Sequence, residues 1–244
     1  FCPARGKWTL NGDVCSNAID KDPCAQCFEN RDYFEEVYNL THQRLQWVRQ
    51  MANIVVLSNY MRRELEYAGV PSARIEVIPP FVHGLTSAPS TPGAYILFVG
   101  RLVETKGFAD AVEAWRRSGI NLPLVVAGAG RARGQVQGDD IEYVGWVGRD
   151  ELSALYANAA LVVLSPRWQE PFGIVGLEAL HCGTPVVAWE SGGIRDWYQG
   201  EAVPWGKTGA LGAAMVRALG QEVSLDPRFE PEPLMQKLEA LYTG

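Results

Sequence analysis

Two glutamates, Glu170 and Glu178, flank a Phe-Gly step between two apolar runs of the chain. The runs, residues 159–165 and 184–189, are typical of buried strands, and the segment between them predicts a loop followed by a helix that begins near Gly173. Open α/β sheets bind ligands at loops of this kind, which follow the carboxyl end of a parallel strand. Both carboxylates can accept hydrogen bonds from hydroxyl groups, which suits a sugar on one side and a ribose on the other.

The start of this predicted helix adds a site for an anion. Its first N–H groups lack partners within the helix, and its dipole is positive at this end, so a phosphate is the natural ligand. We expect Phe172, Gly173 and Ile174 to supply the backbone groups of this site. The competing interpretation is an ordinary helix with a solvated glutamate at each of the two places.

Two cations follow another predicted strand. Residues 94–99 predict a strand, a helix begins near Phe108, and the loop between them carries Arg101 and Lys106. An arginine offers a fork that matches phosphate oxygens, and a lysine offers a point charge. Two basic residues on one loop are usually only solvated. Beside the glutamate segment, however, they predict a single site, with cations on one loop and a helix start on another.

These segments together resemble glycosyltransferase family four. The resemblance is carried by three groups of residues: Phe98-Val99-Gly100-Arg101-Leu102 with Lys106-Gly107, Glu170-Pro171-Phe172-Gly173 with Glu178, and Gly183-Thr184-Pro185-Val186-Val187-Ala188 followed by Gly192-Gly193-Ile194-Arg195-Asp196. Members of this family are retaining enzymes of the GT-B fold, which has two Rossmann-like halves. The resemblance covers residues 53 to 242. It implies an α/β fold with a parallel sheet and helices on both faces, and an N-terminal Rossmann half that is incomplete.

The resemblance also implies an activity. It predicts the transfer of a hexosyl-type sugar from a UDP- or GDP-type diphospho-sugar to an acceptor with retention of configuration, in polysaccharide, glycolipid or glycoconjugate synthesis. Arg101 and Lys106 would bind the diphosphate and stabilise charge on the leaving group. Glu170 would accept from a sugar hydroxyl and Glu178 from the ribose. The donor's own phosphate is thought to deprotonate the acceptor, so the chemistry requires no cofactor.

Three further positions complete the expected donor site. Gly100 and Gly128 each follow a predicted strand, where a glycine permits close approach of the backbone to a nucleotide. The resemblance places the nucleotide base near the backbone of Val147. Two alternative functions remain open: a module that binds nucleotide-sugars without turnover, and an epimerase or phosphorylase on the same fold.

The sequence predicts three regions. Residues 1–90 are expected to be a remnant of the acceptor-side domain with a cysteine-rich segment, residues 91–225 the donor-binding domain, and residues 226–244 a C-terminal helix that returns toward the N-terminal half. Within the first region, residues 30–51 predict an amphipathic helix. Because the earlier strands of the acceptor half are not found, we expect a fragment that binds the donor without appreciable transfer.

The first 27 residues hold a group of cysteines: Cys2, Cys15, Cys24 and Cys27. A Cys-x-x-Cys pair with two further thiols nearby is a usual ligand set for tetrahedral zinc. We therefore expect a structural zinc ion, with free thiols, disulfides and an iron–sulfur cluster as alternatives. Cys182 stands apart on a predicted helix and is expected to be a small core residue.

The composition fits a globular enzyme. The 244 residues are 47% hydrophobic and 20% charged, and the net charge of −6 argues against a nucleic-acid partner. No apolar run approaches the ~18 residues that a membrane-spanning helix needs. We expect a cytoplasmic protein that takes a sugar or lipid-linked acceptor. A location at the inner face of the membrane, with peripheral contact through the missing N-terminal half, is the alternative.

Overall fold

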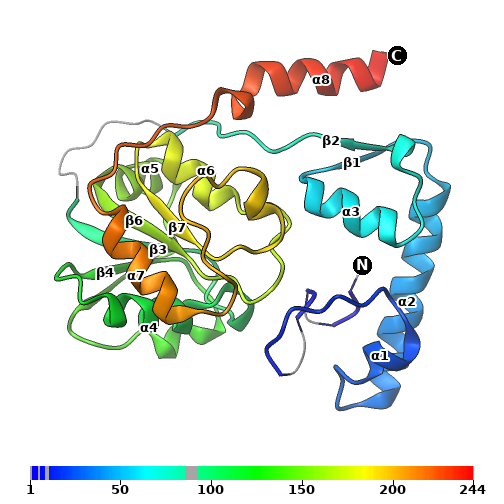
Figure 1. Ribbon diagram of the computed structural model, residues 1–244, viewed down its shortest axis with the longest axis horizontal. Helices are drawn as coiled ribbons and strands as arrows, with labels where there is room; N and C mark the ends of the chain where they lie inside the picture. Colours follow the sequence, from blue (N-terminus) through cyan, green and yellow to red (C-terminus); the bar gives the residue numbers. More distant parts are fainter. Residues whose placement is uncertain (1, 5, 9–10, 86–92, 244) are drawn as a thin grey trace.

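The computed structural model describes residues 2–4, 6–8, 11–85 and 93–243. Its main feature is a five-stranded parallel sheet in the order β5-β4-β3-β6-β7 (Figure 1). The chain adds strands on one side of β3 and then returns to add β6 and β7 on the other, so a topological switch point lies between β3 and β6. The strands are β3 (Tyr95–Val99), β4 (Leu124–Ala127), β5 (Ile141–Gly145), β6 (Ala159–Leu164) and β7 (Val186–Ala188).

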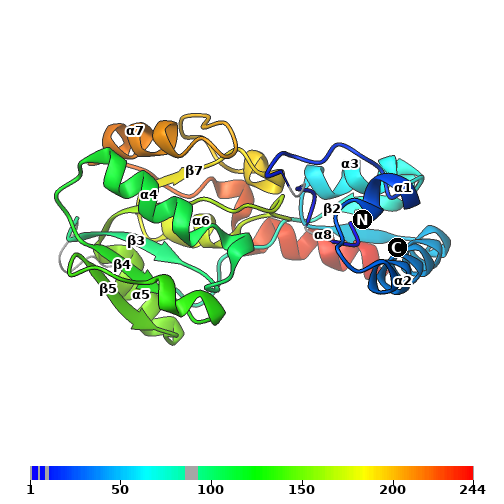
Figure 2. The same ribbon diagram turned by 90° about the horizontal axis from the view of Figure 1, so that it is seen from below.

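Helices cover both faces of this sheet (Figure 2). Alternate residues of a strand point to opposite faces, and in β3 Ile96 and Phe98 face one layer while Leu97 faces the other. The two layers are α4 (Phe108–Ser118) with α7 (Thr208–Ala218), and α5 (Arg149–Asn158) with α6 (Ile174–His181). This confirms the predicted α/β class with helices on both faces.

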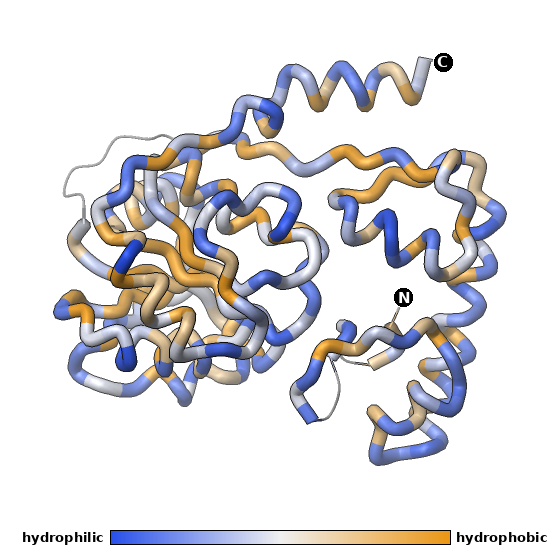
Figure 3. Tube along the Cα trace, viewed as in Figure 1, coloured by the Kyte–Doolittle hydropathy of each residue, from blue (hydrophilic) through white to orange (hydrophobic). Residues whose placement is uncertain are grey.

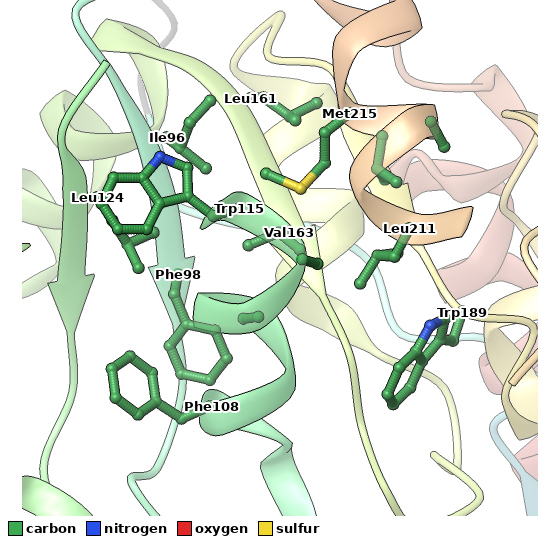
Figure 4. Close-up of a cluster of buried hydrophobic side chains, with 14 of the residues drawn as sticks. Ile96, Phe98, Phe108, Trp115, Leu124, Leu161, Val163, Trp189, Leu211 and Met215 are labelled. Carbon is green, nitrogen blue, oxygen red and sulfur yellow. The ribbon is translucent and has the colours of Figure 1, made fainter. Parts of the chain in front are cut away.

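The sheet is buried on both sides, which explains its nearly continuous apolar sequence. Figure 3 shows these strands as hydrophobic stretches of the chain. Figure 4 shows one of the two core layers, in which aromatic and aliphatic side chains of the sheet meet those of α4 and α7. Its labelled residues are Ile96, Phe98, Phe108, Trp115, Leu124, Leu161, Val163, Trp189, Leu211 and Met215. The rigid layer fixes the strand ends from which the site loops start.

The N-terminal part of the described chain has a smaller sheet, in which β1 pairs with β2 in parallel. A small apolar cluster that includes Val56 and Leu65 holds the helix of this unit on the sheet. The apolar patterns of residues 53–58, 59–68 and 74–78 predict a strand, a helix and a strand, and the structure has these elements within a few residues of those ranges. The elements are α1 (Lys21–Ala25), α2 (Arg31–Gln50), β1 (Ile54–Val56), α3 (Asn59–Tyr67) and β2 (Ile75–Val77).

Two long helices belong to the ends of the described chain. The predicted amphipathic helix at residues 30–51 is confirmed as α2, which Asn30 caps by accepting from the N–H of Tyr33. The last helix, α8 (Pro231–Thr243), extends from the five-stranded sheet toward the side of the two-stranded sheet (Figures 1 and 2). Within the described ranges, no helix combines the length and the apolar composition that crossing a bilayer requires. The limits of the three regions stay a prediction.

Candidate functional site

A small cavity of about 70 Å³ lies at the switch point, between the carboxyl ends of β3 and β6. The residues that line this cavity lie on separate loops of the chain, and the fold brings them together around one space. Of the predicted site residues, those that line this cavity are Gly100, Lys106, Glu170, Gly173 and Ile174. The lysine ends the short 3-10 helix η2 (Glu104–Lys106), and the glutamate lies in the loop after β6.

Lys106 and Glu170 form an ion pair across this cavity. The Lys106 Nζ atom lies 2.8 Å from Oε2 and 3.1 Å from Oε1 of Glu170. The indole Nε1 of Trp168 donates to the same Oε2 at 2.6 Å, and the lysine nitrogen lies 4.9 Å from the centre of the tryptophan ring. The glutamate side chain is only 13% exposed. Most acceptor positions of this carboxylate are therefore used within the protein.

The start of α6 faces the cavity beside this ion pair. Gly173 has a left-handed backbone with φ of +89°, and no side chain caps the helix. The Gly176 N–H donates to the Gly173 carbonyl oxygen at 3.0 Å, so the N–H groups of Ile174 and Val175 are the ones that a ligand can take, and they add to the positive charge of Lys106. A cation and a helix start on one cavity wall favour an anion such as a phosphate.

A second ion pair joins the two loops of the cavity. Arg167 donates to both oxygens of Asp110 at 2.6 and 2.7 Å, and Asp110 is almost fully buried in the first turn of α4. The Ser165 hydroxyl donates to the Gly107 carbonyl oxygen at 2.8 Å. A Cβ atom on Gly107 would lie 1.7 Å from the carbonyl oxygen of Ser165, so only glycine fits next to Lys106. The position of the lysine is thus fixed by the loop that carries its partner.

The Gly-Gly motif supports the backbone of Glu170. It opens the 3-10 helix η4 (Gly192–Asp196), and the Gly193 N–H donates to the Glu170 carbonyl oxygen at 2.7 Å. A Cβ atom on Gly192 would lie 2.2 Å from that oxygen, which explains the glycine. The Ser191 hydroxyl donates to the Trp168 carbonyl oxygen at 2.7 Å and accepts from the Glu170 N–H at 3.2 Å.

The N-terminal part of the chain contacts the same loop. The buried Ser58 hydroxyl donates to the Pro171 carbonyl oxygen at 2.6 Å. The N–H of Asn59, at the start of α3, donates to a carboxylate oxygen of Asp196. The β1–α3 unit therefore meets the loop after β6 directly next to Glu170.

Glu178 lies one helical turn beyond Ile174 on α6 and is half-buried. Its Oε2 atom accepts a hydrogen bond from the Tyr156 hydroxyl at 2.8 Å. Burial raises the pKa of Glu178 above its usual value, while the bond from Tyr156 and the nearby positive charge of Arg149 act to lower this pKa. This carboxylate is thus held by a neutral donor.

Five predicted site residues lie outside the cavity wall: Glu178, Gly128 and the three residues described next. Arg101 is exposed and forms no ion pair with any described residue. The Phe172 side chain is buried in the core, and its carbonyl oxygen accepts from the indole of Trp197 at 2.7 Å. Val147 is half-buried against the core layer of α5 and α6. Their contacts with a donor remain predictions.

Gly128 also lies outside the wall, and the structure gives it a packing role. A Cβ atom at this position would lie 1.9 Å from the carbonyl oxygen of Gly100. The Gly128 N–H also donates to the carbonyl oxygen of Gly145 at 2.6 Å. The glycine is therefore required for the close approach of the loops after β3, β4 and β5, and its contact with a nucleotide remains a prediction.

Sequence reasoning missed several residues that build this site: Asp110, Tyr156, Arg167, Trp168 and Ser191. Arg167 and Trp168 directly precede the Glu170 motif, so their place in the loop was a usable signal. Tyr156 gave none, because an aromatic residue inside a helix is usually a core residue. Asp110 and Ser191 are common residues at such positions, and only the fold shows their partners.

The structure does not support the predicted zinc site. Cys2, Cys15, Cys24 and Cys27 line one cavity of about 370 Å³. Within the described residues, however, no group of three or more His, Cys, Asp or Glu side chains is arranged to hold a metal ion. Cys24 lies on α1, and burial raises the pKa of its free thiol. Metal analysis of the purified protein will decide this prediction.

Cys182 is the remaining cysteine. It is 4% exposed at the end of α6, and burial raises the pKa of its thiol to about 11. The prediction of a core residue is confirmed.

The fold matches that of solved GT-B glycosyltransferases. The structure matches that of a variant of S. aureus TarM, solved with Fondaparinux, alpha-GlcNAc-glycerol and UDP, with a TM-score of 0.71 and 16% identity, over 84% of this chain and 47% of that one. Residues 87–214, more than half of the 244, match the family model for glycosyl transferases group 1. The chain belongs to this family.

Sequence relatives agree with this assignment. The chain is 36% identical over 182 residues to a glycogen synthase of Mycobacterium tuberculosis, which covers 66% of this chain and 42% of the relative. It is 39% identical over 111 residues to an uncharacterized glycosyltransferase of Methanocaldococcus jannaschii, which covers 41% of this chain and 28% of the relative. The chain thus spans at most about two fifths of the length of these relatives.

Proposed function

We propose that this chain binds the nucleotide diphospho-sugar donor of a retaining glycosyltransferase of family four. The observation that carries the proposal is the cavity at the switch point, where Lys106 and the uncapped start of α6 face the same space beside Glu170. A diphosphate matches this arrangement because it can take the point charge and the free N–H groups together. The TarM structure, which contains UDP, supports a uridine nucleotide as the first ligand to test.

The remaining assignments follow from this placement. Arg101, exposed on the loop after β3, would add a second cation to the diphosphate from outside the cavity. Glu170 would accept from a hydroxyl of the donor sugar, and Glu178, one turn along α6, from the ribose. The cations would stabilise the charge that develops on the leaving diphosphate, which is the main catalytic contribution of the protein. The donor's own phosphate would take the acceptor's proton on the same face, which gives retention.

The proposal also covers the acceptor of the transferred sugar. We propose a sugar or lipid-linked acceptor in polysaccharide, glycolipid or glycoconjugate synthesis. The contact of Ser58 and Asn59 with the loop of Glu170 supports an acceptor side formed next to the β1–α3 unit. Nothing in this mechanism needs a protein nucleophile.

Calorimetric titration of the 244-residue chain with UDP and with GDP tests the donor site. We expect saturable binding of one of them, and a loss of at least about tenfold in affinity in the double variant Arg101→Ala, Glu178→Ala, since each contact to a charged group contributes about 1.5–3 kcal/mol. Arg217→Ala is the control, because this exposed arginine lies on α7, pairs with Glu201 and does not line the cavity. Unchanged affinity in the double variant contradicts these assignments.

A failure of the folded chain to bind either nucleotide contradicts the proposed donor site as a whole. If the chain binds the nucleotide, the small amount of sugar product that we expect it to form from the donor distinguishes the remaining possibilities. A product with retained configuration supports the retaining transferase. Formation of an epimer or of a sugar phosphate supports an epimerase or a phosphorylase on the same fold.

A further inference from the structure

We propose that Tyr156 is the positioning residue of Glu178, and that their contact makes the donor site select ribonucleotides over deoxyribonucleotides. The inference rests on the proposed function, because it assumes that Glu178 faces the ribose. It concerns the Tyr156 hydroxyl, which is not among the site residues that the sequence predicts.

The contact is built from the core outward. Tyr156 is fully buried on α5, and its ring belongs to the core layer that includes Leu177 of α6. The buried Thr184 hydroxyl donates to the Tyr156 carbonyl oxygen at 2.5 Å and fixes the end of α5. The Tyr156 hydroxyl therefore reaches Glu178 from a rigid support, at 2.8 Å from Oε2.

This geometry gives the two oxygens of the Glu178 carboxylate different roles. Oε2 accepts from the buried phenol, so Oε1 is the oxygen with the greater free acceptor capacity for a ligand hydroxyl. A carboxylate on a helix surface without such a partner can rotate between several rotamers, and binding would have to fix it. A second hydrogen bond from the core reduces that cost, in the same way that supporting residues fix metal ligands or catalytic side chains.

The charges around Glu178 agree with an acceptor role. Burial raises the pKa of Glu178, while the Tyr156 hydrogen bond and the positive charge of Arg149 act in the opposite direction. The pKa of Tyr156 itself lies well above its usual value because of burial and of Glu178, so the phenol remains a donor. The tyrosine thus helps to keep Glu178 ionised, and an ionised carboxylate can only accept from the ribose hydroxyls.

The chain offers a matched tyrosine for comparison. Tyr95 on β3 donates through its hydroxyl to the Leu155 carbonyl oxygen at 2.9 Å. Tyr95→Phe removes one hydroxyl and one hydrogen bond, as Tyr156→Phe does, and it leaves the contact of Glu178 unchanged. A merely structural role of the Tyr156 hydroxyl would give the two variants the same effect on ligand binding.

The experiment measures the affinity of the full 244-residue chain for UDP and for its 2′-deoxy and 3′-deoxy analogues by calorimetry, or for the GDP series if the chain prefers GDP. In the unmodified chain we expect at least one deoxy analogue to bind about tenfold more weakly, the loss typical of a hydrogen bond to a charged group. In Tyr156→Phe we expect this ratio to fall to about two, chiefly through weaker binding of the ribonucleotide. Tyr95→Phe should keep the ratio of the unmodified chain.

An unchanged ratio in Tyr156→Phe overturns the inference. The same holds if the unmodified chain binds UDP or GDP but does not distinguish either deoxy analogue, although the proposed donor site then stands. If the chain binds neither nucleotide, the proposed function fails and this inference fails with it. Circular dichroism checks that both variants fold.

Glu178→Asp tests the same contact from the other side and does not alter the buried ring. Aspartate is one methylene shorter, so its carboxylate cannot keep the Tyr156 hydrogen bond at the same backbone position. We expect the ratio to fall in this variant as well. A ratio that is unchanged in Glu178→Asp overturns the inference even if Tyr156→Phe does not fold.

Discussion

The two glutamates of the site are held in opposite ways. Glu170 lies in a loop, is 13% exposed, and has a lysine and an indole as donors. Glu178 lies on α6, is half-buried, and has a neutral phenol as its closest donor. Burial raises the pKa of Glu178. The chain therefore places two glutamate side chains, eight positions apart, in two different environments.

The difference indicates what each carboxylate can give to a ligand. Glu170 already satisfies the cation that the diphosphate needs, so a bound donor would share Lys106 with Glu170 rather than find it free. Glu178 has no adjacent cation of this kind and keeps acceptor capacity for hydroxyl groups. In the proposed donor site, Glu170 would therefore hold Lys106 at the phosphate end and keep little acceptor capacity for a sugar hydroxyl, and Glu178 would be the stronger acceptor for a neutral hydroxyl.

Lys106→Met should have the largest effect, because it removes the point charge from the cavity and leaves the Glu170 carboxylate with the Trp168 indole as its side-chain donor. We expect UDP or GDP affinity, measured by calorimetry, to fall roughly 10- to 100-fold, since contacts between charged groups contribute about 1.5–3 kcal/mol. Lys207→Met is the control, because Lys207 is exposed at the start of α7. Equal affinities in the two variants would place the diphosphate elsewhere.

Glu170→Gln should destabilise the protein, because it leaves a partly buried lysine without its anion. We expect the free energy of unfolding at pH 7, from urea denaturation, to fall by about 1–2 kcal/mol, less than for a fully buried pair because Lys106 is partly exposed. Glu190→Gln is the control, since its pair with Arg195 is long, at 3.8 Å, and exposed. A loss no larger than that of the control would mean that the ion pair contributes little.

Glu178→Gln should have a smaller effect of opposite sign. The folded pKa of Glu178 is raised, so ionisation of this group costs stability once the pH exceeds the folded pKa, and the contribution is most favourable below its unfolded value of 4.5. Glutamine still accepts from Tyr156 and carries no charge. We expect a gain of up to about 1 kcal/mol at pH 7, as for other functional residues that reduce stability.

The pH dependence of this gain is the sharper measurement. It should shrink as the pH falls through the raised pKa toward 4.5, because the wild-type carboxyl then becomes neutral as well. Urea denaturation of both proteins across this range gives the difference. A gain in stability that does not change with pH, or a loss of stability at pH 7, would contradict the description of Glu178 as a half-buried carboxylate whose pKa is raised by burial.

The fold could be predicted from the sequence in large part. Residues 159–165 and 184–189 are continuous apolar runs, which are typical of strands buried on both faces. Their loops then lie at one edge of the sheet because parallel strands share a direction. Lys106 and Glu170 could for this reason be assigned to one site, although 64 positions separate them.

The partners within the site could not be predicted in the same way. Whether Lys106 pairs with Glu170 or stays free depends on side-chain distances that no sequence period encodes. The same applies to Tyr156 and Glu178, which come from two different helices. Gly128 had a plausible role at a nucleotide, yet its conformation is required by a carbonyl oxygen of a neighbouring loop.

The contact between Asn59 and Asp196 has a consequence for measurement. The amide proton of Asn59, at the start of α3, is held by the carboxylate of Asp196, which follows β7 of the five-stranded sheet. Its exchange with deuterium requires that this contact open, so its rate reports how often the two units separate, whereas the amides inside β3 report global unfolding. Nuclear magnetic resonance of the isotope-labelled protein in heavy water would thus record the opening of the molecule at a single backbone position, without any added ligand.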